Sequence, residues 1–212
     1  MDTSPSIEAV IFDVGGVLDV PSNPHAEELD RMQVASELGL ELDEMWSTFY
    51  HSQAWRNARV GKITEVEFWN QVLTPFGIVE PEAQWDFITR LWKHKEVNPA
   101  MRSLIESLHG NIRLAIISNA TDILPWILNE RFQVAHFFEV IINSWEVGYA
   151  KPDPEIYNIA LRQLDLDSER TVFIDDQLHN VVAAQELGMH AVQFDGVEAL
   201  TDYLQSLNVP GV

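Results

Sequence analysis

The sequence of 212 residues contains no cysteine. Disulfide bonds and thiol chemistry are therefore excluded, both as sources of stability and as catalytic devices. The first residues carry neither the basic nor the apolar region of a secretory signal peptide. Because chains without disulfides are typical of reducing compartments, we expect a cytoplasmic location.

Basic residues are scarce. The chain has 13 lysines and arginines against 33 acidic residues, which gives a formal net charge of −20. Such a charge repels nucleic acids and anionic membrane surfaces, so we expect neither as a partner. No apolar run approaches the roughly 20 residues that a membrane-spanning helix needs. An anionic small substrate would need local compensation by a metal ion or by a few Lys and Arg side chains.

Several common cofactor motifs are also missing. The chain has no Walker loop and no Gly-x-Gly-x-x-Gly motif, and its seven histidines include no pair at zinc-binding spacing. These absences argue against the common nucleotide-binding loops and against a histidine-based zinc site.

The stretch Ala9-Val-Ile-Phe-Asp-Val-Gly-Gly-Val-Leu18 is the first informative feature that is present. Its apolar run is typical of a strand buried on both faces of a parallel sheet. The run ends at Asp13, and Gly15 and Gly16 permit a sharp turn and a close approach to a bound group. Alone, this pattern is equally consistent with simple turn chemistry and with a catalytic carboxylate.

A helical block of about 70 residues follows, as judged by the spacing of its apolar residues. We predict helices over 26–38, 42–51, 53–60, 66–73 and 81–92, the fourth opened by the capping box Thr64-Glu-Val-Glu67. Five of the seven tryptophans lie in this block, and we expect a small aromatic core rather than a ligand cage; they are Trp46, Trp55, Trp69, Trp85 and Trp92. We interpret the block as an insert with its own core.

From residue 98 onward, strand and helix patterns alternate. Apolar runs predict strands over 112–117, 140–142, 171–174 and 191–194, with helices before, between and after them, including one over 121–131. Strands that alternate with helices imply a parallel sheet with right-handed crossovers. Together with the first strand, this predicts an α/β fold with a doubly wound, Rossmann-like sheet of about five strands.

Polar residues follow three of the predicted strands. Asp13 ends the first, Ser118 and Asn119 end the second, and Asp175 and Asp176 end the fourth. In such sheets, ligands bind beyond the carboxyl ends of the strands, where the winding reverses. Adjacent acids there repel each other unless a cation lies between them. A hard divalent ion such as Mg²⁺, held by carboxylates, water and a phosphate, fits this arrangement.

These residues, with Lys151, resemble the four motifs of the haloacid dehalogenase superfamily in order and spacing: Asp13 with its Gly-Val-Leu, Ser118, Lys151 and Asp175-Asp176. The motifs span residues 9–195. The segments 149–157 and 173–189 resemble the branch that contains sugar-phosphate phosphatases and the phosphatase domain of epoxide hydrolase. The resemblance implies a Rossmann-like core formed by 1–18 and 96–212, and an α-helical cap formed by 19–95.

The resemblance also implies a Mg²⁺-dependent phosphatase that hydrolyses a small phosphorylated metabolite, such as a sugar phosphate. Asp13 would be the nucleophile and form an aspartyl-phosphate. Ser118 would bind a phosphoryl oxygen, and Lys151 would balance the charge of the transition state. The metal ligands would be Asp13, the backbone carbonyl of Gly15 and Asp176, with Asp175 as an outer ligand and Asn180 where a further Asp often stands.

The sequence departs from the superfamily pattern at Gly15. Active phosphatases of this superfamily usually carry a second Asp at that position, which acts as general acid and base. Asp19 is near in sequence, but we expect it to point away. Haloalkanoic acid dehalogenases also lack this acid and resemble the chain at Asn119, so a 2-haloacid dehalogenase using Asp13 is one alternative. Those enzymes typically lack the paired acids and need no metal, which favours the phosphatase. A non-catalytic phosphate-binding module is the other alternative.

The helical block also carries basic residues at a spacing of three, Arg56, Arg59 and Lys62. This spacing places them near one face of a helix. We expect Arg56 and Arg59 to bind the substrate together with Ser118, Asn119 and Lys151. The alternative is a solvated basic face.

Overall fold

The computed structural model describes residues 6–19, 21 and 23–212. Its centre is a five-stranded parallel sheet with the strand order β3-β2-β1-β4-β5. The strands are β1 (Ala9–Phe12), β2 (Arg113–Ser118), β3 (Val140–Asn143), β4 (Thr171–Asp175) and β5 (His190–Gln193). The predicted doubly wound α/β fold is therefore confirmed.

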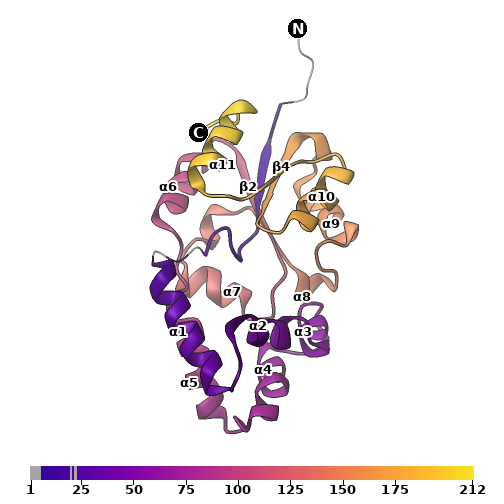
Figure 1. Cartoon of the computed structure of the whole chain (residues 1–212). Helices are drawn as coiled ribbons and strands as arrows, with labels where there is room; N and C mark the ends of the chain where they lie inside the picture. The colour runs from indigo at the N-terminus through magenta and orange to yellow at the C-terminus, as the bar shows by residue number, and fades with distance from the viewer. Residues whose placement is uncertain (1–5, 20, 22) are drawn as a thin grey trace.

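Helices cover both faces of this sheet (Figure 1). Successive side chains of a strand point to opposite faces. Val10 and Phe12 of β1 therefore belong to one apolar cluster, with α6 (Pro99–Leu108) and α11 (Val197–Ser206), whereas Ala9 and Ile11 belong to another, with α9 (Pro154–Leu164) and α10 (Leu178–Glu186). All four residues of β1 are fully buried, which explains the uninterrupted apolar run.

The winding of the sheet reverses between β1 and β4, which are neighbours. Connections from β1 proceed through β2 to β3 on one side, and the chain then returns to β4 and β5 on the other side. The carboxyl ends of β1 and β4 therefore form the crevice in which a sheet of this kind binds ligands.

The helical block lies beyond these carboxyl ends, in the lower half of Figure 1. Its helices are α1 (Pro24–Glu37), α2 (Leu42–Tyr50), α3 (Gln53–Ala58), α4 (Glu65–Leu73) and α5 (Pro81–Leu91). All five predicted helices are present, and their ends differ from the prediction by no more than two residues. The block has a buried apolar cluster separate from the two clusters of the sheet.

The predicted aromatic core of this block is present but smaller than expected. Trp69 is buried, and Phe49 packs edge-on against it. Three further tryptophans are partly buried against the cluster, namely Trp46, Trp55 and Trp92. Trp85, by contrast, is 68% exposed. The buried side of α5 is formed by Phe87 and Leu91, and Trp85 lies on the other side of the helix.

Two short elements also differ from the prediction. The helix predicted over 121–131 is a short α7 (Leu124–Trp126) followed by a π-helical turn (Ile127–Arg131). A further helix, α8 (Ser144–Val147), begins where the Asn143 side chain accepts a hydrogen bond from the backbone N–H of Trp145. Among the described residues, no helix is long and apolar enough to cross a membrane.

Candidate active site

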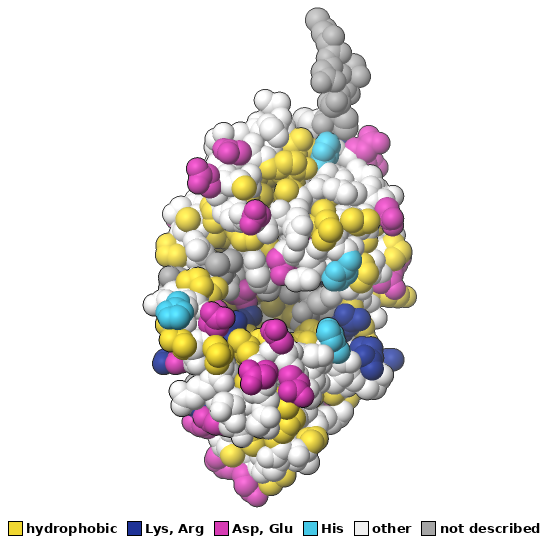
Figure 2. Space-filling model, in the orientation of Figure 1, with side chains coloured by type: hydrophobic (Ala, Val, Ile, Leu, Met, Phe, Trp, Pro, Cys, Tyr) yellow, Lys and Arg dark blue, Asp and Glu magenta, His cyan; other side chains and the backbone are white. Residues whose placement is uncertain are grey.

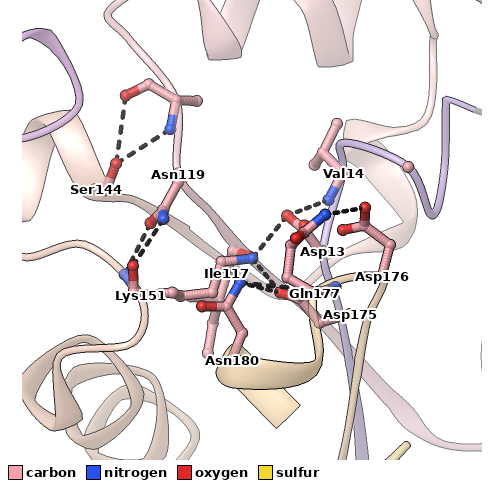
Figure 3. Close-up of polar contacts among 12 residues, drawn as sticks. Asp13, Val14, Ile117, Asn119, Ser144, Lys151, Asp175, Asp176, Gln177 and Asn180 are labelled. Carbon is pink, nitrogen blue, oxygen red and sulfur yellow. Dashed lines mark hydrogen bonds and ion pairs between the residues drawn. The ribbon is translucent and has the colours of Figure 1, made fainter. Parts of the chain in front are cut away.

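Three carboxylates meet at the crevice between β1 and β4. Asp13 follows β1, Asp175 ends β4, and Asp176 comes next in the chain. The two strands are paired with Phe12 opposite Ile174, so their ends lie side by side. One carboxylate oxygen of each acid lies within 4.8 Å of the others. The structure thus brings together the three acids that the sequence suggests as metal ligands (Figure 3).

Lys151 supplies the positive charge of this cluster and is only 1% exposed. Its Nζ lies 2.8 Å from Oδ1 of Asp13 and 2.7 Å from Oδ2 of Asp175. It also donates a hydrogen bond of 2.9 Å to the carbonyl of Ile117. The ammonium group therefore has three acceptors for its three hydrogens, which compensates for the loss of its hydration.

Asn119 holds the main chain of Lys151 in place. Its Oδ1 accepts a hydrogen bond of 2.8 Å from the N–H of Lys151, and its Nδ2 donates one of 2.9 Å to the Lys151 carbonyl. These two bonds link the end of β2 to the loop that precedes α9. In this structure the Asn119 side chain is therefore engaged in positioning Lys151, a role that sequence reasoning missed.

Electrostatics at the cluster are dominated by burial. Burial raises the pKa of Asp13 to about 7, against a lowering influence of Lys151 and a further raising influence of Asp175. Burial likewise raises the pKa of Asp176. Three carboxylates face one ammonium group here, so negative charge is in excess.

The donors present fit a hard divalent cation, which would neutralise this excess. Oδ1 of Asp13 accepts hydrogen bonds from the Val14 N–H, at 2.7 Å, and from Lys151, but no described residue donates to its Oδ2. Within the described part of the chain, no backbone amide donates to the carbonyl of Gly15. The Gly15 carbonyl is thus available to a metal ion, and Oδ2 of Asp13 to a metal ion or to a reacting phosphate.

Asp175 differs from the other two acids because its oxygens are already engaged. Oδ1 accepts hydrogen bonds from the Gln177 N–H and from Nδ2 of Asn180, and Oδ2 accepts from Asn180 and Lys151. Asp175 is also fully buried. Its carboxylate is therefore arranged to orient Lys151 and Asn180, which is compatible with the expected role of an outer ligand.

Ser118 is buried at the end of β2 and opposite Asn143 of β3. No described residue forms a hydrogen bond with its hydroxyl group, and Ser118 borders the large cavity described below. The hydroxyl is therefore available to a ligand at the strand ends.

Gly16 brings the loop after β1 close to Asp176. It has a left-handed backbone conformation with a φ of 72°. A Cβ added to it would lie 2.8 Å from both Cγ and Oδ2 of Asp176. Gly15 is different, because a Cβ there would meet nothing within 4 Å. The sequence pattern suggests the turn but does not distinguish the roles of the two glycines.

A cavity of about 510 Å³ opens from the strand ends toward the helical block. Gly15, Ser118 and Asn119 border it at the sheet, and aromatic side chains of the block, such as Trp55 and Trp92, line its far part. Sequence reasoning missed this cavity, because its lining comes from segments that lie far apart in the chain.

Asp19 does not point away from the site, contrary to expectation. It is buried and borders the cavity. Its Oδ1 accepts a hydrogen bond of 2.6 Å from the N–H of Gly16, and its Oδ2 forms an ion pair with Lys95. The expectation failed because the partner of Asp19 cannot be seen locally in the sequence. Lys95 lies 76 residues further along the chain, where the helical block returns to the sheet.

The basic residues at and after α3 are not part of the cavity lining. Arg59 is the C-cap of this helix, and Lys62 lies beyond it. Arg56 is exposed, and its guanidinium donates hydrogen bonds to the carbonyl of His51 and to Gln53. Arg59 is half-buried, and burial lowers its pKa. Neither arginine, nor Lys62, is among the residues that line the cavity.

Comparisons with known proteins agree with this geometry. Residues 7–188 match the family model of haloacid dehalogenase-like hydrolases, so the chain belongs to that family. A sesquiterpene phosphatase from Aspergillus oryzae is 30% identical over 87% of this chain and 88% of its own length. A D-ribitol-5-phosphate phosphatase from Bacteroides thetaiotaomicron is 24% identical over 96% of this chain and 98% of its own length.

Among solved structures, the fold is similar to a haloacid dehalogenase family enzyme from Bacteroides thetaiotaomicron in complex with magnesium and inorganic phosphate. The TM-score is 0.70 at 24% identity, over 89% of this chain and 94% of that one. Within its family, this chain is a hydrolase of the phosphomonoesterase class.

Proposed function

We propose that the protein is a Mg²⁺-dependent phosphomonoesterase that acts on a small phosphorylated metabolite through an aspartyl-phosphate on Asp13. One observation carries this proposal: the buried Lys151 bridges Asp13 and Asp175, with Asp176 beside them, at the crevice of the sheet. This combines a carboxylate nucleophile, a fixed cation and a set of oxygen ligands in one place.

In the first step, a carboxylate oxygen of Asp13 attacks phosphorus, the ester P–O bond breaks, and the alcohol leaves with a proton from solvent. In the second step, water attacks the phosphorus of the acyl phosphate, and the P–O bond to Asp13 breaks. Inorganic phosphate is released, and the carboxylate is regenerated. Covalent catalysis of this kind divides one difficult displacement into two.

The surrounding residues then have defined roles. Lys151 holds Asp13 and offsets the negative charge of the reacting centre, and the free hydroxyl of Ser118 donates to a phosphoryl oxygen. Asn119 holds Lys151 in place and borders the phosphate. Held by Asp13, Asp176 and the carbonyl of Gly15, Mg²⁺ would supply the positive charge that reduces repulsion between nucleophile and phosphate.

The names of two relatives suggest two chemistries for the substrate, a terpenoid phosphate and a sugar alcohol phosphate. A sugar phosphate also agrees with the sequence motifs. A contact of Arg56 or Arg59 with the substrate stays a prediction, to be tested by alanine variants of both. A cytoplasmic location likewise stays a prediction.

The proposal is tested by phosphate release from para-nitrophenyl phosphate and a panel of metabolite phosphates, with and without Mg²⁺. Asp13→Asn and Asp176→Asn should abolish metal-dependent activity while the fold is retained. Asp167→Asn, at an exposed acid outside the cluster, is the matched control and should leave activity unchanged. Metal-independent halide release from a 2-haloacid, or full activity of Asp176→Asn, would contradict the proposal.

A further inference from the structure

We infer that the substrate is a phosphate monoester of a hydrophobic alcohol, whose hydrocarbon body occupies the cavity between the sheet and the helical block. This inference rests on the proposed phosphatase function and names the class of its substrate.

The cavity borders the candidate active site. Val14, Gly15 and Ser118 border it at the strand ends, next to Asp13. Its volume of about 510 Å³ lies within the range of about 300–1,000 Å³ that small-molecule sites have. A phosphate held at Asp13 would therefore direct the organic part of the substrate into this space.

Most of the lining is apolar and much of it is aromatic. The helical block and the segment after β2 both contribute large rings, among them Tyr50, Trp55, Trp85, Trp92, Trp126 and Phe132. Figure 2 shows hydrophobic side chains in the hollow between the two halves of the molecule. Transfer of hydrocarbon from water onto such a surface is favourable in proportion to the area buried.

Two of these rings are exposed although they are among the largest apolar side chains of the chain. Trp85 on α5 is 68% exposed, and Trp126 on α7 is 53% exposed. Trp85 belongs to the helical block and Trp126 to the segment that follows β2, and both border the same cavity. Exposed apolar surface that lines a concave site marks a place where an apolar ligand binds.

The charged residues of the lining already have partners within the protein. Asp19 and Lys95 form an ion pair. Glu65 accepts hydrogen bonds from the Thr121 hydroxyl and from the indole of Trp69.

The fourth charged residue, Arg131, is engaged as well. Its guanidinium donates hydrogen bonds to the carbonyls of Trp92 and Lys95. The four charged groups of the lining sum to no net charge, and each is held by the protein itself.

This arrangement disfavours a polyol as the body of the substrate. Aromatic rings can stack on the apolar face of a sugar, but each buried hydroxyl also needs a hydrogen-bond partner. A polar group buried without one costs binding energy. Beyond the phosphate end, the remaining polar side-chain groups of the lining are the hydroxyls of Tyr50 and Thr89 and the indole N–H groups of the tryptophans. The indoles only donate, so acceptors for the several hydroxyl hydrogens of a polyol are few, whereas a hydrocarbon needs none.

The test measures kcat/KM with Mg²⁺ for saturated n-alkyl monophosphates from ethyl to decyl, kept below micelle-forming concentrations, and for D-ribitol 5-phosphate. All are phosphates of primary alcohols, so the leaving group is nearly constant. We expect kcat/KM to rise by up to about fourfold per methylene until the cavity is filled. Decyl phosphate should exceed D-ribitol 5-phosphate by at least about 10²-fold.

A second experiment uses variants of the two exposed tryptophans that line the cavity. Trp85→Ala and Trp126→Ala should lower kcat/KM for decyl phosphate by about tenfold or more and leave that for ethyl phosphate nearly unchanged. Val79→Ala, at an exposed apolar residue outside the cavity lining, is the matched control and should change neither.

Hydrolysis of para-nitrophenyl phosphate distinguishes a failure of this inference from a failure of the proposed phosphatase function. Mg²⁺-dependent hydrolysis of this compound with a flat chain-length profile, or with a preference for D-ribitol 5-phosphate, would overturn the inference and leave the phosphatase function standing. No metal-dependent hydrolysis of any phosphate would overturn both.

Discussion

Gly16 and Asp176 lie so close that a side chain at Gly16 would displace the carboxylate. A Cβ there would be 2.8 Å from Cγ and Oδ2 of Asp176, and the φ of 72° disfavours any residue with a Cβ. The left-handed conformation costs a non-glycine residue about 1–2 kcal/mol. The loop after β1 thus restricts where the candidate metal ligand Asp176 can lie.

We therefore expect Gly16→Ala to weaken Mg²⁺ binding by about tenfold to a hundredfold, the range found when the support of a metal ligand is disturbed. Gly15→Ala is the matched control, because a Cβ there meets nothing within 4 Å. Titration of Mg²⁺ by calorimetry compares the two variants. Equal affinities would show that contact with Gly16 does not position Asp176.

Lys151→Met removes the cation that Asp13 and Asp175 share and keeps a side chain of similar length. Two buried carboxylates would then have no cation beside them, so we expect the free energy of unfolding to fall by about 3 kcal/mol and kcat to fall by about 10²–10³-fold. Urea denaturation and steady-state kinetics measure these effects. Lys93→Met, which breaks an exposed ion pair with Asp30, is the control and should change neither quantity much. A Lys151 variant as stable and active as wild type would contradict the assigned role.

The raised pKa of Asp13 predicts that Mg²⁺ binding releases protons. In the metal-free protein this pKa is about 7, above the ordinary value of 3.8. The stability that the protonated Asp13 contributes is therefore fully present below about pH 4 and is lost as the pH rises through about 7. A metal ion needs the deprotonated carboxylate, so protons compete with it below about pH 7.

We expect about one proton to be released per Mg²⁺ near pH 6, and almost none above about pH 8. The affinity should fall by up to tenfold per pH unit for each competing proton. Calorimetry in two buffers with different ionisation enthalpies measures the release. Binding at about pH 6 without proton release would mean that Asp13 is already ionised or is not a ligand.

Gly15 leaves the site without an acid at the position where this family usually carries one. A positioned acid typically contributes about 10²–10⁴-fold by protonating the leaving oxygen. Asp19 is paired with Lys95 and is not a free substitute. Between substrates with similar organic groups, we therefore expect a strong preference for the better leaving group, such as an aryl phosphate over an alkyl phosphate of similar size, or a sugar 1-phosphate over the 6-phosphate.

Gly15→Asp tests this explanation, because the position has room for a side chain and borders the cavity. The dependence of kcat/KM on leaving-group pKa should become less steep in this variant, with Gly15→Asn as the uncharged control. A wild-type enzyme that hydrolyses sugar 1- and 6-phosphates at equal rates, or prefers the 6-phosphate, would contradict the prediction.

The sheet and the strand-end acids could be predicted from the sequence because their signals are local. A fully buried strand such as β1 shows an unbroken apolar run, and a carboxylate at its end has no packing reason to be there. The cavity could not be predicted in the same way. Trp69 and Trp85 lie in similar helical patterns, but only the packing of the block decides that one is buried and the other lines the cavity. Asn119 likewise acquires its role from Lys151, which lies 32 residues further along the chain.

The proposed function requires that Asp13 becomes phosphorylated during turnover. The most direct measurement is a rapid acid quench of wild-type enzyme turning over para-nitrophenyl phosphate with Mg²⁺, followed by mass spectrometry of its peptides. We expect a phosphoryl group on the peptide that contains Asp13, transient in wild type, dependent on Mg²⁺, and absent from Asp13→Asn. A phosphoryl group on another residue, or metal-dependent turnover by Asp13→Asn, would contradict the proposed function.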